Sequence, residues 1–466
     1  RPSGKQYSAR FMNALGSANV YAHSSSCNLS KESAYQLTIG ATGYSNDFAN
    51  AKMVMFIGRS YGDGIRPSSV QSLADAAEHG TRVVIVDPRL NNSGIFASDW
   101  VPINPGTDLA LLMAMANVLI EEDLYDHDFV EQNTYGFEEF AEQAKEYTPE
   151  WAEKITDVPA ETIQELARSM AKAAPAASIE SVGARSSAVR TRLVRDGACH
   201  HGHQLASGLL GREGRRADHV LAEGRRYRGR PLQGAAKPAA KRIGDAEYPL
   251  VLASAGTNVA ALQATLEGEI KGLFFYNSNA AKGYAQPKKW TEALEKTDLV
   301  VTIDVQMSET AQQSDYVLPE VTYLERLELP EFVGGKKHYV GMRTVALEKI
   351  HPETRTCDEI FNGLAEACGV GEYFQFTAED WAEAQLATVG VSLDQMKKEG
   401  VVELPDPHFE YGVPTFKTAS GKFEFKTDKV GEAGLNPVIG WIPRKVTPQS
   451  GEFASWAASR ASTPIP

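Results

Sequence analysis

The stretch KMVMFIGRSYGDGIRPSSVQSLADAAEHGTRVVIVDPR, residues 52–89, decides the fold. Its apolar runs at 52–58 and 81–88 are short and almost unbroken, which is typical of strands buried on both faces. Between them, Pro67, apolar residues at helical spacing and Gly80 predict a helix with a defined start and stop. A strand, a helix and a second strand in this order predict a parallel pair joined by a crossover helix.

The same alternation continues beyond this stretch and recurs later in the chain. Residues 106–124 predict a second helix that Thr107 or Asp108 caps. Residues 132–173 are expected to be mostly helical. The later elements are a strand and polar loop at 270–279, a helix at 287–297, strands within 298–311 and 314–325, and a helix at 359–370.

We therefore predict an α/β fold made of two Rossmann-like αβα units with parallel-rich sheets. The first unit is expected at residues 1–245 and the second at 246–375. From 376 to 466 proline and acidic residues increase, and we interpret this part as a connection toward a domain outside the chain.

The bulk composition narrows the class of protein. The chain has 466 residues, 42% of them hydrophobic, which is enough for several globular domains. A formal net charge of −13 argues against a general affinity for nucleic acid or anionic lipid. The longest apolar run, residues 109–120, is too short to span a bilayer. Because the chain starts at Arg1 without a signal segment, we interpret it as a fragment.

Residues 186–240 do not fit the α/β pattern. Eleven arginines and no lysine occur between positions 185 and 230, and residues 197–204 read GACHHGHQ. A basic patch that binds polyanions and a poorly packed loop are two interpretations. A third is a metal site formed by Cys199, His200 and His203.

A fourth interpretation of this region is a shifted reading frame. Suitable codons shifted by one base turn residues 199–215 into AIMAINSLLGCWGGKGG, an apolar helix followed by a glycine loop. The end of the chain, ASWAASRASTPIP, is a run of mostly small residues that a shifted reading frame also explains. We favour this interpretation over a metal site, and sequencing of the gene tests it. Of the remaining cysteines, Cys357 and Cys368 are expected to be ordinary structural thiols.

Polar loops follow the predicted strands of the first unit. Residues 58–67 offer glycine amides in front of a helix, which suits a phosphate group or a plain tight turn. Asp87 ends the second strand, where an acid can accept hydrogen bonds from a ribose or base, or form a turn. Asp108 starts a helix, where it can accept from guanine or act as a simple cap. Together the loops indicate a nucleotide site more strongly than any one of them does.

These motifs resemble the molybdopterin oxidoreductases of the dimethyl sulfoxide reductase superfamily. The resemblance rests on SCNLSKESAY, GRSYGDGIRPSSV and the run from VDPR to NPGTD, and it continues in FFYNSNAA and FKTASGKFEF. The nearest members are the catalytic subunits of polysulfide, thiosulfate and tetrathionate reductases. It covers nearly all of the chain outside 186–240 and the C-terminal end.

The resemblance implies a molybdenum or tungsten bis(molybdopterin guanine dinucleotide) cofactor. Cys27 matches the position of the family's metal ligand and is expected to be the catalytic and metal-binding residue, since a thiolate suits such a metal. Asn28 replaces the histidine of formate dehydrogenases, which argues against formate as the substrate. Contacts to one guanine dinucleotide arm are expected from Gly58, Arg59, Asp87, Arg89, Gly106 and Asp108, and contacts to the other from Asn277, Asp304, Thr310 and Asp315.

The family also implies parts that the chain does not contain. A [4Fe-4S] cluster is expected in an N-terminal part, and a β-barrel is expected after the C-terminal connection. Expected partners are an iron–sulfur electron-transfer subunit, a membrane anchor subunit and a small sulfur compound as substrate, in anaerobic respiration at the periplasmic face. Alternatives are a reductase of another oxide or oxyanion, a non-catalytic electron-transfer relative, and an unrelated nucleotide-binding domain. An inactive copy from a shifted gene is a further alternative.

Overall fold

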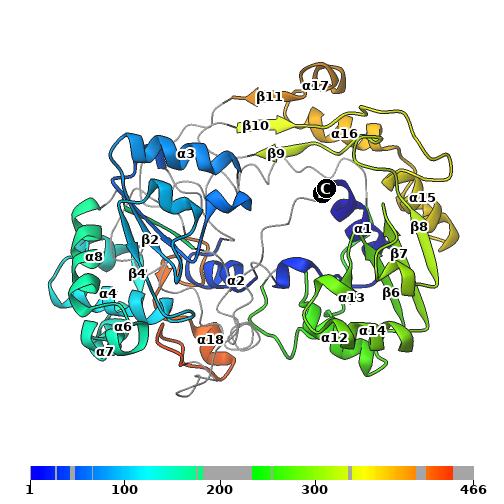
Figure 1. Cartoon of the computed structure of the whole chain (residues 1–466). Coiled ribbons are helices and arrows are strands. Elements are labelled where there is room, and N and C mark those ends of the chain that lie inside the picture. Colours follow the sequence, from blue (N-terminus) through cyan, green and yellow to red (C-terminus); the bar gives the residue numbers. More distant parts are fainter. Residues whose placement is uncertain are drawn as a thin grey trace. The chain divides into compact units, whose positions relative to one another are not determined.

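The computed structural model describes residues 2–26, 29–41, 48–65, 67–174, 177–181, 234–252, 255–333, 338–405 and 416–443. These residues form two compact units (Figure 1). We name each unit after a central strand. The β1 unit comprises the described residues within Cys27–Asp218, Tyr248–Ala253 and Glu410–Pro466. The β7 unit comprises those within Arg1–Ser26, His219–Glu247 and Ser254–Phe409.

The β1 unit is built on a parallel sheet with the strand order β3-β2-β1-β5. Its strands are β1 (Met53–Ile57), β2 (Arg82–Val86), β3 (Asp99–Val101) and β5 (Ala177–Ser181), and a separate small pair is β4 (Thr134–Tyr135) with β12 (Phe423–Glu424). Its helices are α2 (Leu29–Thr38), α3 (Pro67–Glu78), α4 (Asp108–Glu121), α5 (His127–Asn133), α6 (Phe137–Ala144), α7 (Pro149–Thr156), α8 (Ala160–Ala173) and α18 (Asp428–Glu432).

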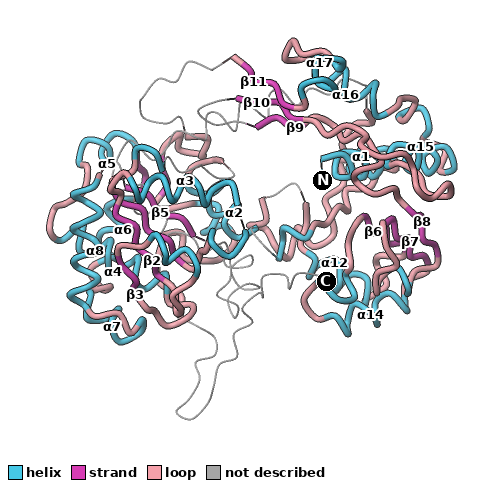
Figure 2. The backbone as a smooth tube through the Cα atoms, turned by 45° about the horizontal axis from the view of Figure 1, so that its top comes forward, coloured by secondary structure: helices cyan, strands magenta, loops and turns pink. Residues whose placement is uncertain are grey.

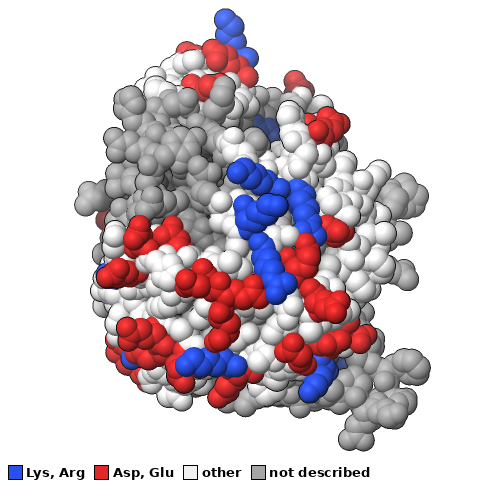
Figure 3. Space-filling view, turned by 90° about the vertical axis from the view of Figure 1, so that its left-hand side faces the viewer, with Lys and Arg blue, Asp and Glu red and all other residues white. Residues whose placement is uncertain are grey.

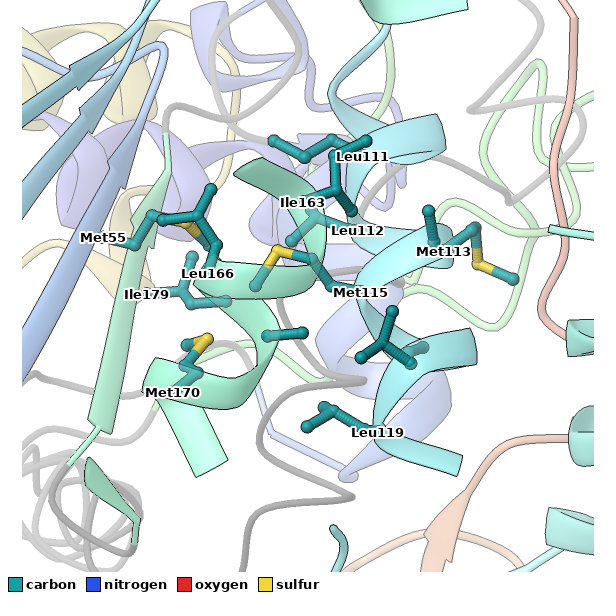
Figure 4. Packing of buried hydrophobic residues seen from close by; sticks show 14 of the residues in the cluster. Met55, Leu111, Leu112, Met113, Met115, Leu119, Ile163, Leu166, Met170 and Ile179 are labelled. Atoms are coloured by element: carbon teal, nitrogen blue, oxygen red, sulfur yellow. The ribbon is translucent and has the colours of Figure 1, made fainter. Parts of the chain in front are cut away.

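Helices cover both faces of this sheet (Figure 2). Because side chains alternate along a strand, Val54 and Phe56 of β1 pack with Leu73 of α3, while Met53 and Met55 pack on the opposite side. Figure 4 shows that second side, where α4 and α8 supply most of the core. The residues of α4 from Ala110 to Leu119 are all buried, so α4 is a core helix.

Figure 3 shows one face of the molecule by charge. Acidic side chains spread over much of the lower part of this face, several Lys and Arg side chains form a group near its centre, and other Lys and Arg side chains lie apart from that group. Two ion pairs link α8 to neighbouring elements. Arg168 of α8 pairs with Glu122 at 2.7 Å, and Glu165 of α8 pairs with Arg82 of β2 at 2.7 Å.

Among the described residues, no helix is both long and apolar enough to cross a bilayer.

The β7 unit contains two three-stranded sheets. The parallel sheet has the order β6-β7-β8, and the antiparallel sheet has the order β11-β10-β9. The strands are β6 (Gly272–Tyr276), β7 (Leu299–Asp304), β8 (Tyr316–Pro319), β9 (Glu331–Val333), β10 (His338–Gly341) and β11 (Val401–Leu404). The helices are α1 (Pro2–Ala14), α12 (Asn258–Leu266), α13 (Ala280–Gly283), α14 (Pro287–Lys296), α15 (Cys357–Ala367), α16 (Ala378–Ala387) and α17 (Leu393–Glu399).

The parallel sheet of this unit is also covered by helices on both faces. Phe275 and Val300 pack with Trp290 and other residues of α12 and α14. On the other face, Ile303 belongs to a core that α1 and α15 share. The predicted α/β class with parallel sheets is thereby confirmed, and helices lie at the predicted positions around 67–78, 108–121, 287–296 and 357–367.

The unit boundaries differ from those expected. The first helix packs in the β7 unit, because Tyr7 lies edge-on against Trp381 at 4.7 Å between ring centroids. Residues 376–404, expected to be a connection, form α16, α17 and β11 of that same unit, and they bury Leu386 and Met396 in its core. Residues 416–443 return to the β1 unit, where Phe425 stacks on Phe140 at 4.9 Å.

Candidate functional site

The loops after β1 and β2 meet at the carboxyl edge of the β1 sheet, where parallel sheets bind ligands. Gly58 follows β1 directly, has a φ of +57°, and donates its N–H to the Val86 carbonyl at 2.9 Å. A Cβ at Gly58 would meet no atom within 4 Å. The positive φ favours glycine, and the open space around the position leaves the backbone accessible to an approaching group.

Asp87 follows β2 and already takes part in its own loop. One carboxylate oxygen accepts from the Arg89 backbone N–H at 3.0 Å, and the other accepts from the Asn91 amide at 3.1 Å. The turn-forming interpretation of Asp87 is thus realised. Each oxygen has more than one acceptor site, so the carboxylate retains capacity for a ligand.

Asp63 joins these two loops and was not identified from the sequence. Its carboxylate accepts from the Arg89 guanidinium at 2.9 Å and from the Asn92 amide at 2.6 Å. The Gly62 N–H donates to the Ser93 hydroxyl at 3.0 Å. Arg89 is thereby fixed beside the turn at η3 (Tyr61–Ile65), with its side chain 63% exposed. The Arg59 guanidinium lies over the Tyr61 ring, with its Cζ 5.2 Å from the ring centroid.

The third predicted loop of this unit precedes α4. Gly106 has a φ of +75°, and Asp108 is the first residue of the helix. Thr107 occupies the N-cap position, but its hydroxyl donates to the Asn104 carbonyl at 2.6 Å and makes no capping bond to the helix. The expected cap position is correct, while the capping hydrogen bond is absent.

The carboxyl edge of the β7 sheet brings together three of the predicted residues. Asn277 follows β6 and Asp304 ends β7, and the register of these strands places them side by side. Asp304 is buried, and its carboxylate accepts from the Val305 N–H at 2.7 Å and the Ser308 hydroxyl at 3.1 Å. Glu320, which follows β8, donates its N–H to the Asp304 carbonyl at 3.1 Å.

Thr310 is the third predicted residue at this edge, and Asn279 holds it. The Asn279 carbonyl oxygen accepts from both the N–H and the hydroxyl of Thr310, at 3.2 and 3.0 Å. The Asn279 amide donates to Glu309 at 2.6 Å. Hydrogen bonds from Lys282 and then from Asn279 lower the pKa of Glu309 to about 2. This network fixes the loop after β6 to the loop after β7.

Asp315 does not lie with the others. Its carboxylate accepts from the Val300 N–H at 2.8 Å, at the start of β7. Asp304 is at the end of that strand, roughly 13 Å away at the usual rise per residue. The geometry therefore separates Asp315 from the edge that Asn277, Asp304 and Thr310 share.

Buried ionisable groups surround Glu320. Its carboxylate contacts the Arg326 guanidinium and accepts from the Tyr276 hydroxyl at 2.8 Å. Arg326 also pairs with Glu328 at 2.8 Å. Burial, followed by the nearby Glu320 charge, raises the pKa of the Cys357 thiol well above its usual range. Cys357 is therefore a structural thiol and a poor nucleophile, as predicted, whereas Cys368 is exposed.

Several predicted positions lie outside the described residues. They include Cys27 and Asn28, the residues Cys199, His200 and His203 of the less favoured metal-site interpretation, and most of the segment 186–240. Within the part of the chain that is described, no group of three or more His, Cys, Asp or Glu side chains is arranged to hold a metal ion.

Parallel sheets with helices on both faces and polar loops at their carboxyl edges define an α/β protein whose loops lie where such sheets bind ligands. Comparison with known proteins specifies the class further. The family model described as molybdopterin oxidoreductase matches residues 5–331. The chain therefore belongs to the molybdopterin oxidoreductase family, as its motifs indicated, and members of this family are oxidoreductases.

The chain is similar to several characterised members. It is 31% identical over 425 residues to the thiosulfate reductase molybdopterin-containing subunit PhsA of Salmonella typhimurium, covering 86% of this chain and 54% of that protein. It is 27% identical over 495 residues to dimethyl sulfoxide reductase DmsA of Haemophilus influenzae, covering 92% and 60%. The solved acetylene hydratase from Pelobacter acetylenicus has the same fold, with a TM-score of 0.75 and 24% identity over 94% of this chain and 64% of that one. The chain thus spans little more than half the length of its relatives.

Proposed function

We propose that this chain forms the nucleotide-binding part of the catalytic subunit of a molybdenum bis(molybdopterin guanine dinucleotide) oxidoreductase. The observation that carries the proposal is the presence of two parallel sheets, each with acidic and amide side chains at its carboxyl edge. A carboxylate offers only acceptors, which suits the N–H groups of guanine and the hydroxyls of ribose.

The donor set fits the nucleotide ends of such a cofactor. In the β1 unit, Asp87 supplies acceptors, Arg89 supplies a guanidinium for phosphate, and Gly58 opens its backbone to close approach. In the β7 unit, Asp304 and Asn277 supply the acceptors, and Thr310 shapes the loop. When bound, the cofactor supplies the metal and the redox-active pterins, with Cys27 proposed as the protein's ligand to the metal. Asp315 is withdrawn from this set because of its position at the start of β7.

We propose a sulfur compound such as polysulfide, thiosulfate or tetrathionate as the substrate, reduced in anaerobic respiration. The similarity to a thiosulfate reductase subunit supports this choice. Reduction of thiosulfate consumes electrons and protons, breaks its sulfur–sulfur bond, and yields sulfide and sulfite. An iron–sulfur partner with a [4Fe-4S] relay and a membrane anchor, at the periplasmic face, remains part of the proposal.

Another reductase of the family is the alternative, since dimethyl sulfoxide reductase and an arsenate respiratory reductase are similar to nearly the same extent. A panel of substrates decides between them. The full-length protein with a reduced viologen dye is expected to turn over a sulfur–sulfur compound with a kcat/KM at least about tenfold above that for dimethyl sulfoxide or arsenate. A higher kcat/KM for dimethyl sulfoxide or arsenate than for the sulfur–sulfur compound would overturn the substrate assignment and leave the cofactor proposal intact.

A further inference from the structure

Glu320 occupies a position at the ligand edge that neither the sequence motifs nor the family match assigns. It comes directly after β8, as Asn277 comes directly after β6. Its side chain is fully buried, with 0% exposure. One of its oxygens, Oε1, contacts the Arg326 guanidinium and accepts from the Tyr276 hydroxyl. The other oxygen, Oε2, accepts from the Asn277 side-chain amide at 3.1 Å.

This contact fixes which way the Asn277 side chain is oriented. A carboxylate accepts hydrogen bonds and does not donate them, so the group of Asn277 that faces Glu320 must be the NH₂. The carbonyl oxygen of Asn277 then has no hydrogen-bond donor among the described residues, and the residue as a whole is exposed. Its φ of +46° is held by a bond from its N–H to the Ile303 carbonyl at 2.9 Å.

An outward carbonyl oxygen selects the chemistry of the group that it contacts. It accepts from hydroxyl and N–H donors and repels phosphate oxygens, which are themselves acceptors. We infer that Glu320 is a positioning residue that sets the hydrogen-bond polarity of Asn277, so that Asn277 binds a ribose hydroxyl or a base N–H of the guanine dinucleotide. This inference rests on the proposed function and specifies which part of the ligand the β7 edge recognises.

The Glu320→Gln variant tests the polarity directly. Its Oε1 can still face Tyr276 and Arg326, but an NH₂ then replaces Oε2 and opposes the NH₂ of Asn277. Asn277 is expected to turn its amide around and present a donor to the ligand. Losing this hydrogen bond is expected to speed release of the cofactor about tenfold. The measurement is the rate at which pterin fluorescence appears in the filtrate of the loaded full-length protein.

A double variant distinguishes polarity from simple loss of structure. In Asn277→Asp with Glu320→Gln, one aspartate oxygen accepts from the new glutamine and the other again faces outward as an acceptor. Total charge is unchanged, and the release rate is expected to return to within about threefold of wild type. Tyr276→Phe is the matched control, because it removes the other side-chain hydrogen bond of Glu320 and leaves Asn277 in place; its release rate should stay within about twofold.

The outcomes separate this inference from the proposed function. Unchanged release from Glu320→Gln, or faster release that the double variant does not slow, overturns the inference alone. A wild-type protein that carries no guanine nucleotide overturns the proposed function and the inference with it. Should Glu320→Gln not fold, Asn277→Gly removes the acceptor without disturbing the buried ion pair and should also speed release about tenfold. Unchanged release from that variant overturns the inference equally.

Discussion

Replacing Arg326 with alanine is expected to lower the free energy of unfolding of the β7 unit by about 3–5 kcal/mol. Counted as whole residues, Arg326 is 7% exposed, and Glu320 and Glu328, which it contacts, are 2% and 4% exposed. Without the guanidinium, two carboxylates remain buried with one fewer countercharge, and a buried, uncompensated charge is costly. Urea-induced unfolding followed by circular dichroism measures the change.

Arg343 supplies the matched control. It pairs with the same Glu328 at 3.1 Å, but its side chain is 45% exposed, so water screens the charge and compensates for its loss. Arg343→Ala is expected to cost about 1 kcal/mol or less. Equal effects of the two substitutions would contradict the view that Arg326 is the central charge of the cluster.

Replacing Cys27 with alanine is expected to remove nearly all reductase activity of the full-length protein. Removing a group that merely orients a metal ligand typically costs about 10–100-fold, so loss of the proposed ligand itself should cost at least about a hundredfold. The assay is dye-linked reduction of the sulfur substrate, with molybdenum and pterin measured in the same preparation.

Cys368→Ala is the control for this substitution, because its thiol is exposed and has no proposed role. Its activity is expected to stay within about twofold of wild type, as for most surface substitutions. A Cys27→Ala protein with full cofactor content and unchanged activity would remove Cys27 from the metal site. A member of the family whose metal has a different protein ligand, or none, would then be the better interpretation.

The elements that the sequence predicted well are those whose signal is local. The two apolar runs form β1 and β2, because buried parallel strands are almost continuously apolar. The segment between them, which Pro67 and Gly80 delimit, forms α3. The strand-end positions of Asp87 and Asp304 followed from the same pattern. Their loops could be placed at a ligand edge because parallel strands end on the same side.

What the sequence did not predict depends on contacts between distant segments. The packing of Tyr7 on Trp381 assigns the first helix to the β7 unit, and no local pattern signals it. Asp315 looked equivalent to Asp304 until its bond to the Val300 N–H placed it at the other end of the strand. Glu320 could have been found, since it follows β8 as Asp87 follows β2, but its partner Asn277 lies 43 residues away.

We propose that each of the two parallel sheets binds one guanine nucleotide of a cofactor that carries two of them. Acid hydrolysis of the purified full-length protein, with quantification of the GMP released, tests it most directly. We expect about two GMP per chain, one for the carboxyl edge of each of the two parallel sheets, together with molybdenum or tungsten. Asp87→Ala and Asp304→Ala should each lower the cofactor content. A full-length, folded protein that releases no GMP, or about one GMP per metal atom, would contradict the account.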